Sequence, residues 1–100
     1  MVTEKKLQEK ITKYCKKINN VLCYKFSSPS HRGVPDLIII ARGRTIYIEL
    51  KSPKGTGRLS PLQVVTIKKM REHGATVYVI KDYDEAIRII DDLCSESKLH

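Results

Sequence analysis

Apolar residues recur every three or four positions near the start of the chain and form short continuous runs further along. Leu7, Ile11 and Cys15 follow the helical period, and lysines lie on the other side of the helix. Residues 3–19 therefore predict an amphipathic helix, with Thr3 suited to cap its start.

Three segments rich in branched and aromatic residues predict strands: 21–26, 36–41 and 45–51. The stretch "SSPSHRGVP" between the first two is dense in Ser, Pro and Gly and predicts a loop. Arg42-Gly43 joins the other two segments closely enough for a two-residue hairpin turn.

The second half of the chain predicts a helix, a strand and a helix. Ser60 begins a Ser-Pro-Leu-Gln sequence, which supplies an N-cap, a proline at the first helical position and Gln63 three residues after the cap. This helix should run over residues 60–73 and stop at Gly74. A strand at 76–81 and a helix at 84–94 complete the order α-β-β-β-α-β-α. We therefore expect one compact α/β domain over residues 1–100, a small sheet flanked by helices.

Charged residues interrupt the apolar hairpin at three positions. Glu49 and Lys51 are two apart and share one face of their strand. A two-residue turn at Arg42-Gly43 pairs residues whose numbers add up to 85. Asp36 should then lie opposite Glu49, at about 5 Å. Two carboxylates that close repel each other unless a cation lies between them, and Mg²⁺ prefers such oxygen ligands. The alternative is an exposed cross-strand charge cluster with no chemical role.

The net charge of +8 is unevenly distributed. Residues 1–81 hold all but two of the 19 Lys and Arg residues and only five acidic ones, Glu4, Glu9, Asp36, Glu49 and Glu72. This balance favours a polyanionic partner such as nucleic acid over a merely solvated basic surface.

Other compositional features exclude several classes of protein. No apolar run approaches the roughly 20 residues of a membrane span, and the start lacks a signal peptide, so we expect an intracellular, cytoplasmic protein with no membrane partner. Cys15, Cys23 and Cys94 are odd in number and lack metal-site spacing, which predicts free buried thiols.

The motifs together resemble a known family. "GVPDLIII", the following "IELK" and the later "SPKGTGRLSPLQ" are similar to the virus-type replication-repair nuclease (VRR-NUC) branch of the PD-(D/E)XK nuclease superfamily. The resemblance implies a restriction-endonuclease-like mixed sheet. It also implies Asp36, Glu49 and the backbone carbonyl of Leu50 as ligands of Mg²⁺ or Mn²⁺, Lys51 as the catalytic lysine and Gln63 as the motif glutamine.

Two of these assignments leave alternatives. Gln63 also completes a capping box with Ser60, so its purpose is either catalytic or structural. The family's glutamate on the first helix matches Glu4 or Glu9. At about 100° per residue Glu4 lies on the face of the buried stripe whereas Glu9 lies about 140° away, so Glu4 is the better candidate.

Five further basic residues lie on predicted loops or strand ends near this site and are candidates to contact DNA phosphates, although each is also an ordinary solvated charge. They are Lys25, His31, Arg32, Lys54 and Arg58.

The function predicted is that of a metal-dependent DNA endonuclease. The resemblance implies a viral or bacterial enzyme acting on branched DNA, with four-way (Holliday) junctions as the leading substrate. One active site per chain predicts a homodimer when both strands are cut together. The alternatives are a flap or restriction-like nuclease, a non-catalytic DNA-binding module and a replication or repair accessory.

Overall fold

The computed structural model of the protein describes residues 3–52 and 58–95, and its elements follow the predicted order. Their bounds differ from the predicted ones by no more than two residues. The elements are α1 (Glu4–Lys17), β1 (Val21–Lys25), β2 (Leu37–Ala41), β3 (Arg44–Leu50), α2 (Pro61–Glu72), β4 (Thr76–Ile80) and α3 (Tyr83–Cys94).

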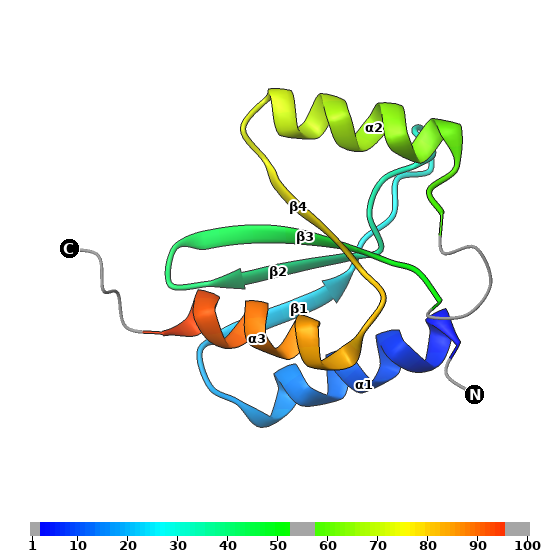
Figure 1. Ribbon diagram of the computed structural model, residues 1–100. Coiled ribbons are helices and arrows are strands. Elements are labelled where there is room, and N and C mark those ends of the chain that lie inside the picture. The colour runs from blue at the N-terminus through cyan, green and yellow to red at the C-terminus, as the bar shows by residue number, and fades with distance from the viewer. Residues whose placement is uncertain (1–2, 53–57, 96–100) are drawn as a thin grey trace.

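The strands form one mixed sheet in the order β1-β2-β3-β4. The pairs β1–β2 and β2–β3 are antiparallel, while β4 runs parallel to β3 after the crossover through α2. Figure 1 shows α1 and α3 side by side on one face of this sheet and α2 on the other. Helices thus flank a small mixed sheet, as predicted.

The β2–β3 hairpin has the predicted register. Leu37 pairs with Ile48 and Ala41 with Arg44, so paired positions sum to 85. Arg42 and Gly43 both have positive φ, 53° and 76°, which suits the right-handed twist of a two-residue hairpin.

The main core fills the space between the sheet and the helices α1 and α3. The apolar stripe of α1 packs there against alternate residues of β2 and β3. Fully buried members are Leu7, Ile11, Leu37, Ile39, Ile48, Leu50, Ile80 and Ile90. Because the even positions of β3 point into this core, Glu49 projects to the opposite face, toward α2.

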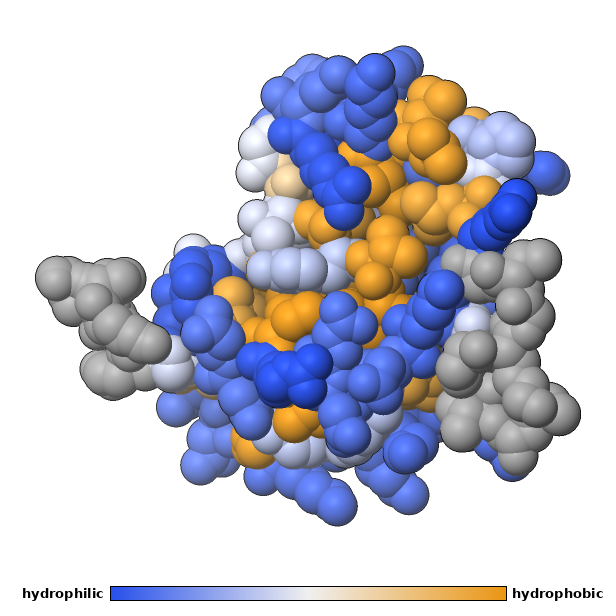
Figure 2. All heavy atoms as spheres, in the orientation of Figure 1, coloured by the Kyte–Doolittle hydropathy of each residue, from blue (hydrophilic) through white to orange (hydrophobic). Residues whose placement is uncertain are grey.

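The helix α2 begins as its sequence predicts. The Ser60 hydroxyl accepts from the Gln63 amide, the Gln63 side chain accepts from the Ser60 amide, and Pro61 occupies the first turn. Ile67 is buried on the inner side of α2, which packs against β4. Leu62, Val64 and Val65 remain exposed, and Figure 2 shows apolar side chains at the surface near α2.

The three thiols are free, as predicted, but only Cys15 is buried, whereas Cys23 and Cys94 are half-buried. Within residues 3–52 and 58–95, no helix has the length and apolar character needed to span a bilayer.

Candidate active site

Asp36 lies at the point where the long loop enters the sheet. Its carboxylate Oδ2 accepts a 2.8 Å hydrogen bond from the amide of Leu50 on the neighbouring strand. Its carbonyl accepts another, also of 2.8 Å, from the amide of Phe26. The strand itself begins one residue later than predicted, because the Asp36 side chain, rather than its backbone, bonds to β3.

Glu49 is a buried carboxylate, with 1 % of its surface exposed. Its Oε2 accepts from Gln63 Nε2 at 2.9 Å and lies 3.5 Å from Lys51 Nζ. Its Oε1 is also buried and has no hydrogen-bond partner among the residues that the structure describes. A buried charge left half-satisfied is costly, so this oxygen is a position where a ligand would be stabilising.

Lys51 lies directly after β3 and projects to the same side as Glu49. Its ammonium donates a 2.9 Å hydrogen bond to Gln63 Oε1. The same Gln63 oxygen accepts from the Ser60 amide at 2.9 Å. The two interpretations of Gln63 are therefore compatible, since one side chain caps α2 and contacts both Lys51 and Glu49.

Glu4 reaches this region from the start of α1. Its Oε2 accepts a 3.3 Å hydrogen bond from the amide of Ser52, just beyond β3. Its charge contributes to raising the pKa of both Asp36 and Glu49. Glu4 and Glu9 are both exposed, and the choice of Glu4 over Glu9 stays a prediction.

Both carboxyl groups of the pair have a raised pKa. Burial, and then the nearby charge of Asp36, raises the pKa of Glu49 to about 7, while Lys51 opposes the shift. Burial also raises the pKa of Asp36, although its hydrogen bond from Leu50 acts in the opposite direction. Two acids that resist ionisation at adjacent strand ends are typical of a functional site rather than of a surface charge cluster.

The residues present suit a hard divalent cation. Asp36 and Glu49 offer carboxylate oxygens, one of them unpartnered, and the Leu50 carbonyl lies in the chain between Glu49 and Lys51. The described residues contain no cluster of three or more His, Cys, Asp or Glu side chains preformed for a metal. A site with two carboxylates depends on water, backbone or phosphate oxygens for its remaining ligands, as Mg²⁺ sites commonly do.

The predicted phosphate-contacting residues have different surroundings. Lys25 is exposed at the end of β1, and Arg58 is exposed shortly before α2. His31 and Arg32 are exposed on the loop before Asp36, where His31 Nε2 lies 3.3 Å from Thr66 Oγ1. Lys54 lies outside the described residues.

The sequence interpretation missed Thr66, a buried polar residue of α2 that contacts this loop. The sequence feature that could have identified Thr66 is its position three residues after Gln63, which places both side chains on one face of the helix.

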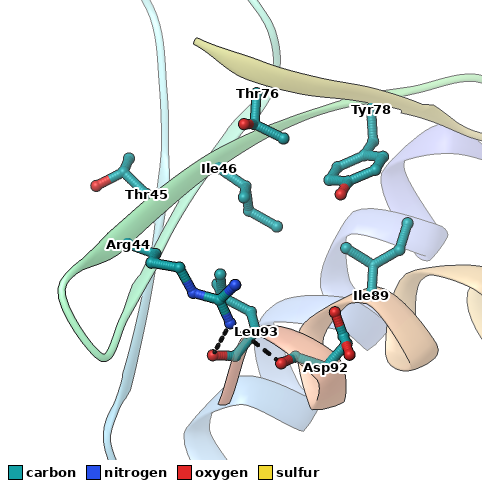
Figure 3. A pocket seen from close by; sticks show the side chains of 8 residues that line it. All are labelled: Arg44, Thr45, Ile46, Thr76, Tyr78, Ile89, Asp92 and Leu93. Atoms are coloured by element: carbon teal, nitrogen blue, oxygen red, sulfur yellow. Dashed lines mark hydrogen bonds between the residues drawn. The ribbon is translucent and has the colours of Figure 1, made fainter. Parts of the chain in front are cut away.

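A separate cavity lies on the opposite side of the sheet. It has a volume of about 330 Å³ and lies between β3, β4 and α3. In Figure 3, Ile46, Tyr78 and Ile89 line it, and Arg44 closes one side by donating to the carbonyls of Asp92 and Leu93 at the end of α3. Its mixed lining includes neither Asp36 nor Glu49, so it is distinct from the carboxylate site.

The fold and the site together define a class: a small mixed α/β domain with two carboxylates and a lysine gathered at the ends of adjacent strands. The comparisons then identify the family. The VRR-NUC domain model matches residues 2–82, so the chain belongs to the VRR-NUC family. The match ends one residue before α3 begins.

Similar proteins agree with this assignment. A protein of Acyrthosiphon pisum secondary endosymbiont phage 1, named "Putative nuclease p44", is 35% identical over 54 residues, which cover 53% of this chain and 57% of that protein. The chain thus spans little more than half the length of this curated relative.

Two solved structures share the fold. A VRR-NUC domain superposes with a TM-score of 0.75 at 24% identity, covering 91% of this chain and 97% of that one. A VRR-NUC domain protein superposes with a TM-score of 0.72 at 26% identity, covering 93% and 88%. The predicted fold class and family are therefore confirmed.

Proposed function

We propose that this protein is a divalent-metal-dependent endonuclease of the PD-(D/E)XK type that hydrolyses DNA phosphodiester bonds. The observation that carries the proposal is the buried, unpartnered Oε1 of Glu49 beside Asp36, with Lys51 and Gln63 in contact with the other Glu49 oxygen. Membership of the VRR-NUC family and similarity to a phage protein named as a nuclease support it.

Asp36, Glu49 and the Leu50 carbonyl would hold Mg²⁺ or Mn²⁺. Such an ion, when bound, supplies charge neutralisation at the phosphate and lowers the pKa of a coordinated water.

The surrounding side chains have separate tasks in this proposal. Gln63 holds the Lys51 ammonium through its carbonyl oxygen and Glu49 through its amide nitrogen, which limits the rotation of both side chains. Lys51 is then oriented to position an attacking water or to stabilise negative charge on the phosphate. Glu4 adds a third carboxylate near the pair and contributes to its electrostatics.

DNA is the proposed partner because the site suits phosphodiester chemistry and the chain carries a net charge of +8. Lys25, His31, Arg32 and Arg58 are exposed around the loops that lead to the site, where they would contact phosphates; the same role is proposed for Lys54. Such contacts position the substrate without reading its sequence.

Branched DNA, with four-way junctions first, is the proposed substrate, and a homodimer is the proposed form. Each chain has one set of Asp36, Glu49 and Lys51, so paired cuts in two strands need two chains. The phage relative also favours a phage-encoded enzyme acting inside a bacterial host.

The test is cleavage of an end-labelled four-way junction beside linear duplex, flap and single-stranded DNA, with Mg²⁺, Mn²⁺ or EDTA. We expect metal-dependent, paired nicks in the junction that are lost in Glu49→Gln and retained in Glu72→Gln, a control acid at the exposed end of α2. Light scattering of the same samples would report the dimer.

Two alternatives predict different results. A flap or restriction-like nuclease would cut another substrate with the same dependence on Glu49. A non-catalytic DNA-binding or repair accessory module would bind DNA and cut none of these substrates with any metal, which would overturn the proposed function.

A further inference from the structure

Thr66 is a buried threonine on the inner face of α2, with 4% of its surface exposed. It lies three residues after Gln63, so the two side chains project from the same side of the helix. Gln63 contacts Lys51 and Glu49, whereas Thr66 contacts the loop that ends at Asp36.

The Thr66 hydroxyl connects this loop to the helix in two ways. It donates to the Arg32 carbonyl at 3.3 Å. His31 Nε2 lies 3.3 Å from the same oxygen. Because the hydroxyl donates to Arg32, its lone pairs can accept from His31 in the tautomer that carries the proton on Nε2, and both loop residues share one anchor.

Gly33 explains how the loop comes so close. A Cβ at this position would lie 2.8 Å from Thr66 Oγ1 and 3.1 Å from the Leu62 carbonyl, and the φ of Gly33 is +90°. Only glycine allows both this backbone conformation and this close approach to α2.

The anchored segment is short and stiff. Val34 and the fully buried Pro35 separate Gly33 from Asp36, whose carbonyl and carboxylate are bonded to Phe26 and Leu50. Because only these two residues lie between Gly33 and Asp36, a shift of the loop at Gly33 also moves Asp36.

We propose that Thr66 is a positioning residue for Asp36. Its hydroxyl fastens the loop before Asp36 to the helix face that carries Gln63, so that a single helix sets the relative placement of both carboxylates and of Lys51. The effect on cleavage rests on the proposed function, but the effect on Asp36 does not.

The experiment compares Thr66→Val, which keeps the shape and removes the hydroxyl, with Thr66→Ser, which keeps the hydroxyl. Thr12→Val is the matched control, since the Thr12 hydroxyl donates to backbone carbonyls of its own helix, those of Gln8 and Glu9. The first readout is the NMR chemical shift of the Leu50 amide, which donates to the Asp36 carboxylate. It therefore reports the position of that carboxylate in the absence of metal and DNA. The second is kcat and KM on the best-cleaved DNA.

Thr66→Val should move the Leu50 amide resonance and lower kcat by about 10- to 100-fold with little change in KM, as for other residues that orient a metal ligand. Thr66→Ser and Thr12→Val should match the wild type in both readouts. A wild-type Leu50 shift in folded Thr66→Val, or a Thr66→Ser protein as impaired as Thr66→Val, would overturn the inference.

Gly33→Ala tests the same contact from the loop side and replaces Thr66→Val in the experiment if Thr66→Val fails to fold. It should also displace the Leu50 amide resonance, and an unchanged resonance would contradict the proposal. If the wild type cuts no DNA, the proposed nuclease function fails, while the Leu50 resonance still decides the role of Thr66.

Discussion

Gln63 and Lys51, which belong to different elements, are joined by a 2.9 Å hydrogen bond from the Lys51 ammonium to the Gln63 side-chain oxygen. The same oxygen caps α2 by accepting from the Ser60 amide. One side chain thus links the start of a helix to the end of a strand, and its proposed catalytic role can be separated from its capping role by mutation.

Gln63→Ala should lose both contributions. We expect about 10- to 100-fold slower DNA cleavage, because Lys51 and Glu49 lose the group that orients them. Ser60→Ala removes only the cap and should cost about 1 kcal/mol of stability with nearly normal cleavage. Cleavage rates and urea unfolding of both variants would check this, and equal loss of rate in both would assign Gln63 a purely structural role.

Lys51→Met keeps the aliphatic stem of the side chain and removes its charge. Cleavage should fall by about 100-fold or more, since the variant loses the charge that the proposed function places at the reacting phosphate. DNA affinity, measured by fluorescence anisotropy, should remain close to that of the wild type because most of the basic residues lie elsewhere. Lys68→Met on the exposed side of α2 is the control, and a similar loss of rate there would argue against a special position for Lys51.

Without metal, the protein should lose stability as the pH rises from about 4.5 to about 7. Glu49 has a pKa of about 7 in the folded protein against an ordinary value of 4.5, so the native state binds its proton more tightly in this window. The preferential binding of this proton stabilises the folded protein by at most about 3 kcal/mol, at 1.36 kcal/mol per pKa unit. This stabilisation is fully present below pH 4.5 and is lost by about pH 7.

Urea unfolding in EDTA between pH 5 and pH 8 would measure this effect. Glu49→Gln should flatten the dependence, because the raised pKa of Glu49 is its cause. A wild-type stability that increases across the same range would contradict the assignment.

Glu4→Gln should lower the pKa of Glu49, because the charge on Glu4 is one of the causes that raise it. Carboxyl NMR titration would show the change in the absence of metal. The same variant should cut DNA about tenfold more slowly if Glu4 supports the site, in the range found for residues around metal ligands. Glu9→Gln, at an exposed position about 140° around the helix from Glu4, should alter neither measurement.

The elements and the hairpin register follow from the sequence alone. Apolar periodicity indicated α1, the Ser-Pro-Leu-Gln motif indicated the start of α2, and the Arg42-Gly43 turn determined which residues of β2 and β3 are paired. These features depend on neighbours within a few residues, where backbone geometry and side-chain alternation leave few choices.

The tertiary structure decided what the charged residues contact. Burial under α2 raised the pKa of Glu49, and the packing of the same helix brought Gln63 and Thr66 to groups 12 to 35 positions away along the chain. Periodicity carries no information about such distant contacts, because they depend on how complete elements pack. The sequence therefore identified the candidate residues of the site, and the packing of α2 against the sheet determined how they are held together.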